Sequence, residues 1–120
     1  LSLVRVGDDL FFHCALEGRK LDLLRRDPRV CVTFVAADQP AYLPESNMYT
    51  TFFQSAVVTG TAFEVTDPGQ KTAALRALCE KMTPGHMEGF EEAVRRSLPS
   101  TAVWGIHMEE VTGKEKARKR

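Results

Sequence analysis

The stretch from Tyr49 to Val65 is the longest β-like run in this chain and constrains the fold most. It is rich in Thr, Val and Phe, which favour extended strands, and it is too long for one flat strand. Gly60 interrupts the run, and a glycine inside a strand often marks a bulge or a bend. The run therefore predicts one ribbon that serves two parts of a curved sheet.

The rest of the sequence predicts further strands. Leu3–Val6 and Leu10–Ala15 flank Gly7-Asp8-Asp9, and this pattern has the form of an antiparallel hairpin with a tight turn. The remaining expected segments are strands at Val30–Ala37 and Thr101–Glu109 and a loop over Asp38–Asn47. The run Val30–Ala37 is β-branched and aromatic and is long enough for a buried strand.

Three helices are expected between and after these strands. The clearest start is Asp67, an N-cap residue followed by Pro68 in the first turn and by Gln70 three residues after the cap. A short helix is expected over Leu21–Arg26, since Pro28 prevents its continuation. Phe90, Val94 and Leu98 recur at helical spacing and predict the third helix.

Composition and charge exclude several classes of function. The chain has 16 Lys and Arg against 16 Asp and Glu, so no overall field attracts nucleic acid or an acidic membrane. No apolar run approaches the roughly 20 residues of a membrane helix. The 3 cysteines are an odd number and lie in apolar or helical runs, which suggests a reducing compartment. We therefore expect a soluble, cytoplasmic protein with no nucleic-acid or membrane partner.

The local motifs of several common sites are missing. Thr112-Gly113-Lys114 resembles the end of a P-loop, but Met108 stands where the first glycine is required. The chain contains neither Gly-x-Gly-x-x-Gly nor Gly-x-Ser-x-Gly. His86 and His107 lack the spacing of zinc ligands, so no metal site is expected.

Arg19 and Lys20 stand where the first hairpin runs into the first helix. A helix N-terminus offers unpaired backbone N–H groups and a partial positive charge, so two cations there favour a bound phosphate. The alternative is a solvated helix face, and Asp22 could pair with Arg19 at i,i+3. Lys20 has no carboxylate at i+3 or i+4.

Two further side chains each have a structural and a functional interpretation. His13 lies in an apolar strand, where its ring could simply bond to the backbone or could contact a ligand. Strand alternation sends Phe12 and Cys14 to one face and His13 to the other, so His13 and Cys14 cannot form a metal pair. Trp104 in the last strand is most simply core, although an aromatic ring can stack on a planar ligand.

The order of these segments resembles a known family. It runs from Phe12-His13-Cys14-Ala15 through Glu17-Gly18-Arg19-Lys20, a short helix and Asp27-Pro28-Arg29-Val30 to Gln54-Ser55-Ala56-Val57-Val58-Thr59-Gly60, and closes with Thr112-Gly113-Lys114-Glu115. This order is similar to that of the pyridoxamine 5'-phosphate oxidase-related flavoproteins, with the nitroimidazole-reductase branch the most similar. The resemblance covers nearly the whole chain.

The resemblance implies an α+β fold, an antiparallel FMN-binding split β-barrel with peripheral helices. It implies a homodimer with FMN at the subunit interface and a small-molecule substrate. Arg19 and Lys20 would hold the FMN phosphate, Gly18 would let the backbone approach it, and Ser55 would contact the cofactor. His13 would lie near the flavin as a catalytic and cofactor-binding residue, and Trp104 would approach it from the partner subunit.

Residues 1–112 are expected to form the split-barrel domain and residues 113–120 a charged tail. The family's N-terminal helix and first strand are expected to be missing from this sequence. The implied function is FMN-dependent oxidoreduction of a small electron-poor molecule, with nitroaromatic reduction as the named candidate. The alternatives are a non-catalytic flavin- or haem-binding protein of the same fold and a dimerisation module that has lost its ligand.

Overall fold

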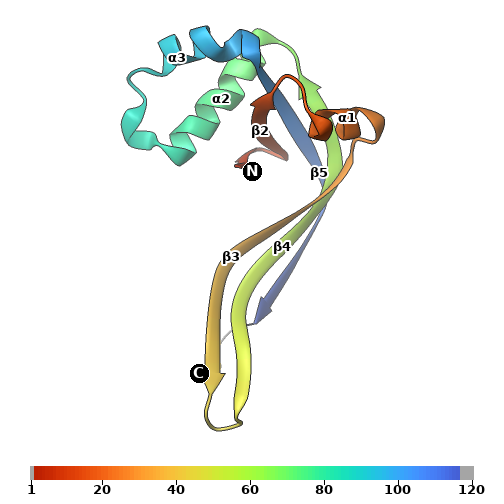
Figure 1. Ribbon diagram of the computed structural model, residues 1–120, viewed down its shortest axis with the longest axis vertical. Coiled ribbons are helices and arrows are strands. Elements are labelled where there is room, and N and C mark those ends of the chain that lie inside the picture. Colours follow the sequence, from red (N-terminus) through yellow and green to blue (C-terminus); the bar gives the residue numbers. More distant parts are fainter. Residues whose placement is uncertain (1, 117–120) are drawn as a thin grey trace. The chain divides into compact units, whose positions relative to one another are not determined.

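The computed structural model of the chain describes the backbone of residues 2–116 and the side chains of these residues except 36–41, 50–53 and 115–116 (Figure 1). The described residues form two compact units. The first unit contains residues 2–30 and 60–108, and the second contains residues 31–59 and 109–116.

The chain contributes five strands and three α-helices within the described residues. In chain order they are β1 (Val4–Val6), β2 (Asp9–Ala15), α1 (Arg19–Arg26), β3 (Arg29–Leu43), β4 (Met48–Val65), α2 (Pro68–Met82), α3 (Phe90–Ser97) and β5 (Thr101–Lys116). The strands form one sheet in the order β1-β2-β5-β4-β3. The predicted α+β class with an antiparallel sheet and a few helices is confirmed.

The pairing of β2 with β5 sets the two faces of the first unit. The strands are antiparallel, with Phe12 opposite Trp104 and His13 opposite Val103. Residues that lie directly opposite one another project to the same face. Phe12 and Trp104 therefore share one face, and His13 and Val103 share the other, as strand alternation predicts.

Helices α2 and α3 cover the face that carries Val103 (Figure 1). Val103 is fully buried there among buried residues of both helices and of neighbouring strands. These residues are Val4, Val65, Ala74, Leu75, Leu78 and Phe90. As predicted, Asp67 caps α2, and its Oδ2 accepts a hydrogen bond of 2.9 Å from the backbone N–H of Gln70.

Two predicted boundaries are wrong. The segment Asp38–Asn47 was expected to be a loop, but β3 continues to Leu43 and only the following residues form the turn. Strand β5 was expected to end at Glu109 but extends to Lys116, so the first residues of the expected charged tail are strand. Both extensions belong to the second unit, where pairing with a neighbouring strand supplies the backbone hydrogen bonds that the local sequence does not predict.

The β3–β4 hairpin of the second unit ends in an aromatic pair. The rings of Tyr42 and Tyr49 lie 4.9 Å apart between centroids, and the Tyr42 hydroxyl lies 2.9 Å from Oδ1 of Asn47. Asn47 has a positive φ of 49°, a conformation that asparagine tolerates well in turns. These contacts fix the turn that joins the two long strands.

Gly60 is expected to be indispensable for the contact between β4 and β5, because a Cβ atom there would overlap the backbone carbonyl of His107. The Gly60→Ala variant should lose about 1–3 kcal/mol of unfolding free energy, the usual cost of overpacking, in urea titrations. Gly85→Ala is the matched control, because a Cβ atom there meets nothing within 4 Å. Equal stability of the two variants would contradict this close approach.

Candidate functional site

The N-terminus of α1 is open and has a glycine as its cap. Gly18 has φ 151° and ψ 163°, and no side chain of the described residues caps the helix. A Cβ atom at Gly18 would meet nothing within 4 Å, so the space above the backbone is clear. The unpaired N–H groups of the first turn and the helix dipole therefore favour an anion at this position.

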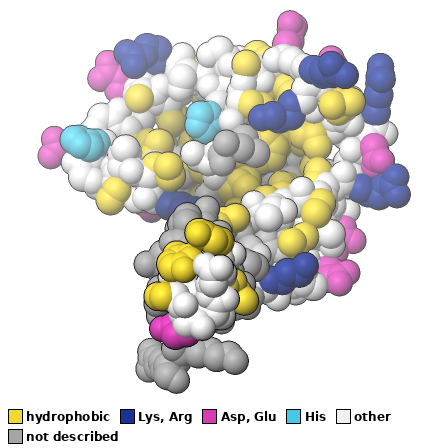
Figure 2. Space-filling view, turned by 60° about the horizontal axis from the view of Figure 1, so that its bottom comes forward, with side chains coloured by type: hydrophobic (Ala, Val, Ile, Leu, Met, Phe, Trp, Pro, Cys, Tyr) yellow, Lys and Arg dark blue, Asp and Glu magenta, His cyan; other side chains and the backbone are white. Residues whose placement is uncertain are grey.

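Arg19 and Lys20 are the first two residues of α1 and both are exposed. In the described part of the chain neither forms an ion pair, so the pairing of Arg19 with Asp22 that the sequence allowed is not found. Figure 2 shows Lys and Arg side chains, with Asp and Glu side chains among them, along the right-hand edge of the view. The two cations are therefore available to a negatively charged ligand.

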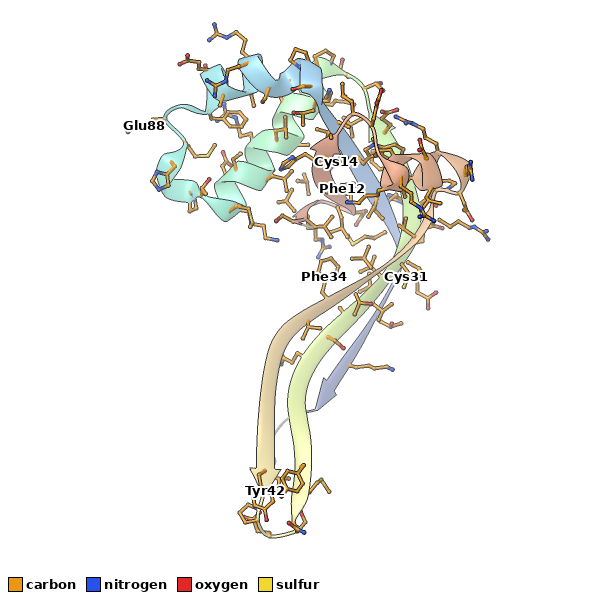
Figure 3. The ribbon with its side chains drawn as sticks, in the orientation of Figure 1. Phe12, Cys14, Cys31, Phe34, Tyr42 and Glu88 are labelled. Atoms are coloured by element: carbon orange, nitrogen blue, oxygen red, sulfur yellow. The ribbon has the colours of Figure 1, made fainter. Side chains whose placement is uncertain are left out.

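Lys20 also lies over the face of β2 that carries Phe12 and Cys14. These two β2 side chains are labelled in Figure 3. Its Nζ lies 5.9 Å from the centroid of the Phe12 ring, at the outer limit of a cation–π contact. Burial raises the pKa of the Cys14 thiol above its ordinary value, and the positive charges of Lys20 and Arg25 partly offset that rise. Phe12 is buried and Cys14 is half-buried, so the anion site borders the apolar interior on this side of β2.

The edge of β2 beside this site is open. β1 pairs with β2 only from Val4 opposite Phe11 to Val6 opposite Asp9, whereas β5 pairs with β2 as far as Ala15. The last residues of β2, from Phe12 to Ala15, therefore have a paired strand on one side only among the described residues. Backbone groups at such an edge can bond to a ligand as they would to another strand.

His13 lies in this open part of β2 and is exposed. Its side chain projects to the face opposite Phe12, so Lys20 and His13 lie on different faces of the strand. A ligand that lies along the open edge can be approached from both faces. The edge is therefore where the structure allows one ligand to contact both side chains.

The remaining two predicted site residues are Ser55 and Trp104, which lie on other strands than His13. Ser55 lies on β4 in the second unit, so its part in the site remains a prediction. Trp104 is only 3 % exposed, which favours the core role. Its indole Nε1 is buried and has no hydrogen-bond partner among the described residues. An unpaired buried donor is uncommon in folded proteins.

The sequence did not predict two features of this region. The sequence predicts that Phe12 and Cys14 share one face of the strand. It does not predict that α1 places Lys20 over this face, because that contact depends on tertiary packing. The Nδ1 atom of His107 lies 2.8 Å from Oδ1 of Asp9, a pair that joins β5 to β2. No group of three or more His, Cys, Asp or Glu residues within the described chain could hold a metal ion.

Comparison with known proteins identifies the family. Residues 1–115 match the family described as pyridoxamine 5'-phosphate oxidase. The chain belongs to this family. The resemblance inferred from the order of segments is thereby confirmed. No curated protein gives a significant match.

Several solved structures have the same fold. One is a candidate 5-nitroimidazole antibiotic resistance protein from Bacteroides thetaiotaomicron, with 26 % identity over 93 % of this chain and 64 % of that chain, and a TM-score of 0.74. A flavocytochrome from Azotobacter vinelandii has 22 % identity over 97 % of this chain and 54 % of that chain, with a TM-score of 0.81.

A third similar structure is an FAD- and haem-binding protein from Mycobacterium smegmatis, with 23 % identity and a TM-score of 0.77. The match covers 94 % of this chain and 56 % of that one. This chain therefore spans between 54 % and 64 % of the length of these three proteins. In the described part of this chain, no helix has the length and apolarity needed to cross a membrane.

The position of Lys20 beside Cys14 predicts a measurable effect on the thiol. Removal of the ammonium in Lys20→Met should raise the pKa of Cys14 further, because one of the charges that offset the effect of burial is lost. The pH profile of iodoacetamide labelling should move to higher pH, measured with Cys31 and Cys79 replaced by Ser.

Arg26→Met is the matched control for this labelling experiment. Arg26 lies in the last turn of α1 and is not among the charges that act on Cys14. Its profile should coincide with that of the parent protein. An unchanged profile for Lys20→Met would contradict the placement of its ammonium.

Proposed function

We propose that this protein is an FMN-dependent oxidoreductase that acts on a small electron-poor molecule. The candidate reaction is the reduction of a nitroaromatic compound. The observation that carries the proposal is the open N-terminus of α1, with Gly18, Arg19 and Lys20, directly after the open edge of β2. Family membership and the flavin-binding neighbours support it.

The residues present suit an FMN phosphate. Arg19 offers a fork of donors for two phosphate oxygens, and Lys20 offers a mobile point charge. Gly18 leaves the backbone accessible, since nothing lies within 4 Å of the position of a Cβ atom there. The positive charge, the hydrogen-bond donors and the free space that a phosphate needs therefore occur together at the N-terminus of α1.

The open edge of β2 suits the planar part of the same ligand. Backbone N–H and C=O groups between Phe12 and Ala15 can bond to polar atoms along the edge of a ring system. Bound FMN supplies the electron transfer, and the protein positions it and limits access of solvent. His13 holds or delivers a proton at its imidazole.

The proposal includes a cytoplasmic homodimer in which the sheet closes into a split barrel and FMN lies between subunits. Exposed apolar side chains of the second unit support it, because a sheet face needs a second layer to be buried. Val35, Tyr49 and Val111 are all more than half exposed, at 61 %, 80 % and 59 %. Ser55 would contact the cofactor in this assembly, whereas an approach of Trp104 from the partner subunit would require its buried ring to become exposed.

A haem- or FAD-binding protein without turnover is the second candidate. It is favoured by two of the structural neighbours, a flavocytochrome and an FAD- and haem-binding protein. Both candidates use the same fold, so the absorption spectrum and the turnover of the purified protein together separate them. Flavin bands with turnover of a nitroaromatic compound support the proposal, flavin bands without turnover favour the non-catalytic flavin protein, and a Soret band favours haem. A protein that stays colourless, and whose melting temperature FMN does not change, is the dimerisation module without a ligand.

Lys20 is expected to contribute directly to FMN affinity. Lys20→Ala should weaken FMN binding by about 1–3 kcal/mol, the value of a charge-assisted hydrogen bond to phosphate. Fluorescence titration of FMN measures the dissociation constant. Arg26→Ala removes a cation from the other end of α1 and should leave the constant unchanged. Equal losses of FMN affinity in the two variants would contradict the assignment of Lys20 as a phosphate contact.

His13 is expected to matter more for turnover than for affinity. His13→Ala should lower the rate of nitroaromatic reduction by about 10²-fold or more, the usual contribution of a general acid or base. FMN affinity should change much less, because His13 carries no phosphate contact in this proposal. Steady-state rates at saturating FMN test the effect, and loss of all flavin binding would instead make His13 a cofactor contact only.

A further inference from the structure

A pocket of about 430 Å³ lies in the first unit, between the sheet and α2. Its walls come from Val6 on β1, Phe11 on β2, Phe63 and Val65 on β4, and one side of α2. Phe11 belongs to the face of β2 opposite Phe12, so the pocket is on the other side of the strand from Lys20. It is therefore separate from the proposed phosphate site.

The pocket has a rigid floor and an apolar wall. Val65 and Ala74 are buried parts of the core. Phe11 and Phe63 meet edge to face, with centroids 6.2 Å apart and an interplanar angle of 88°. Phe63 is 37 % exposed at the mouth. A pocket of this size, preformed and lined by aromatic and aliphatic side chains, has the properties of a small-molecule site, for which about 300–1,000 Å³ is typical.

Small side chains on α2 keep the pocket open. Ala73, Ala74 and Ala77 are the residues of this helix that line it with Gln70. A larger side chain at Ala73, which is exposed at the mouth, would project into the space without disturbing the buried core. Occupation of the pocket can therefore be tested by a single substitution.

One charged group lies at the pocket, and it is negative. The carboxylate of Asp9 lines the pocket with its side chain 32 % exposed, and its Oδ1 lies 2.8 Å from Nδ1 of His107. No Lys or Arg is among the described residues that line it. An apolar cavity with one half-buried carboxylate complements an apolar body that carries a positive charge, and disfavours an anion.

We propose that this pocket binds a small aromatic ammonium compound. The aromatic body packs against Phe11 and Phe63, and the ammonium group donates a hydrogen bond to the Asp9 carboxylate. This site is additional to the flavin site and binds its ligand with or without FMN, since the two sites share no residue. The failure of one proposal therefore leaves the other standing.

The test compares 2-phenylethylamine with the neutral 2-phenylethanol by NMR or calorimetric titration of the whole chain. The amine should bind with a dissociation constant in the millimolar range or below, and about tenfold or more tightly than the alcohol. Asp9→Asn should abolish that preference. Ala73→Leu should weaken binding of the amine by about tenfold or more, because the leucine occupies the pocket.

Ala93→Leu is the matched control, an equal substitution at an exposed alanine of α3 outside the pocket. It should leave the affinity for the amine unchanged. Equal affinity for amine and alcohol would overturn the proposal, as would binding that Ala73→Leu does not affect. If neither probe binds and Ala73→Leu lowers the oligomeric state, the pocket accommodates a second copy of the chain and the proposal is wrong.

Discussion

The pairing of β2 with β5 is the constraint on which the first unit depends. With Phe12 opposite Trp104, the sheet presents one face to α1 and the other to the core under α2 and α3. A shift of register by one residue would exchange the two faces, placing Val103 and its buried neighbours on the wrong side. The same register puts Lys20 and His13 on opposite faces, so it sets the geometry of the proposed flavin site as well as the core.

The short length of β1 has a functional consequence. β1 covers only the first part of β2, up to Phe11, and leaves Phe12 to Ala15 with one paired neighbour among the described residues. The backbone N–H and C=O groups at an open sheet edge lack hydrogen-bond partners unless water or a ligand supplies them. Here the edge leads directly to a helix N-terminus with two cations. A ligand with a planar polar edge and a phosphate satisfies both groups at once.

Much of this arrangement could be predicted from local sequence. The Asp67 cap, the hairpin around Gly7 and the cations after Gly18 each depend on residues close together in the chain. The extension of β3 through Pro40 could not, because proline usually argues against a strand. β3 lies at the edge of the sheet, where the missing N–H of a proline is tolerated. The contact of Lys20 with Phe12 and the meeting of Phe11 with Phe63 depend on tertiary packing alone.

The net charge of zero conceals two sites of opposite local charge in the first unit. Arg19 and Lys20 favour an anion on one side of β2, whereas Asp9 favours a cation at the pocket on the other. Screening in water limits such local fields to roughly 10 Å, so each group acts mainly on a ligand bound beside it. Alternation along one strand therefore places Phe12 in the buried interior beside Lys20 and Phe11 at the pocket, although the residues are adjacent in sequence. The family fold fixes neither ligand by itself, and the side chains on each face of β2 decide which chemistry that face can bind.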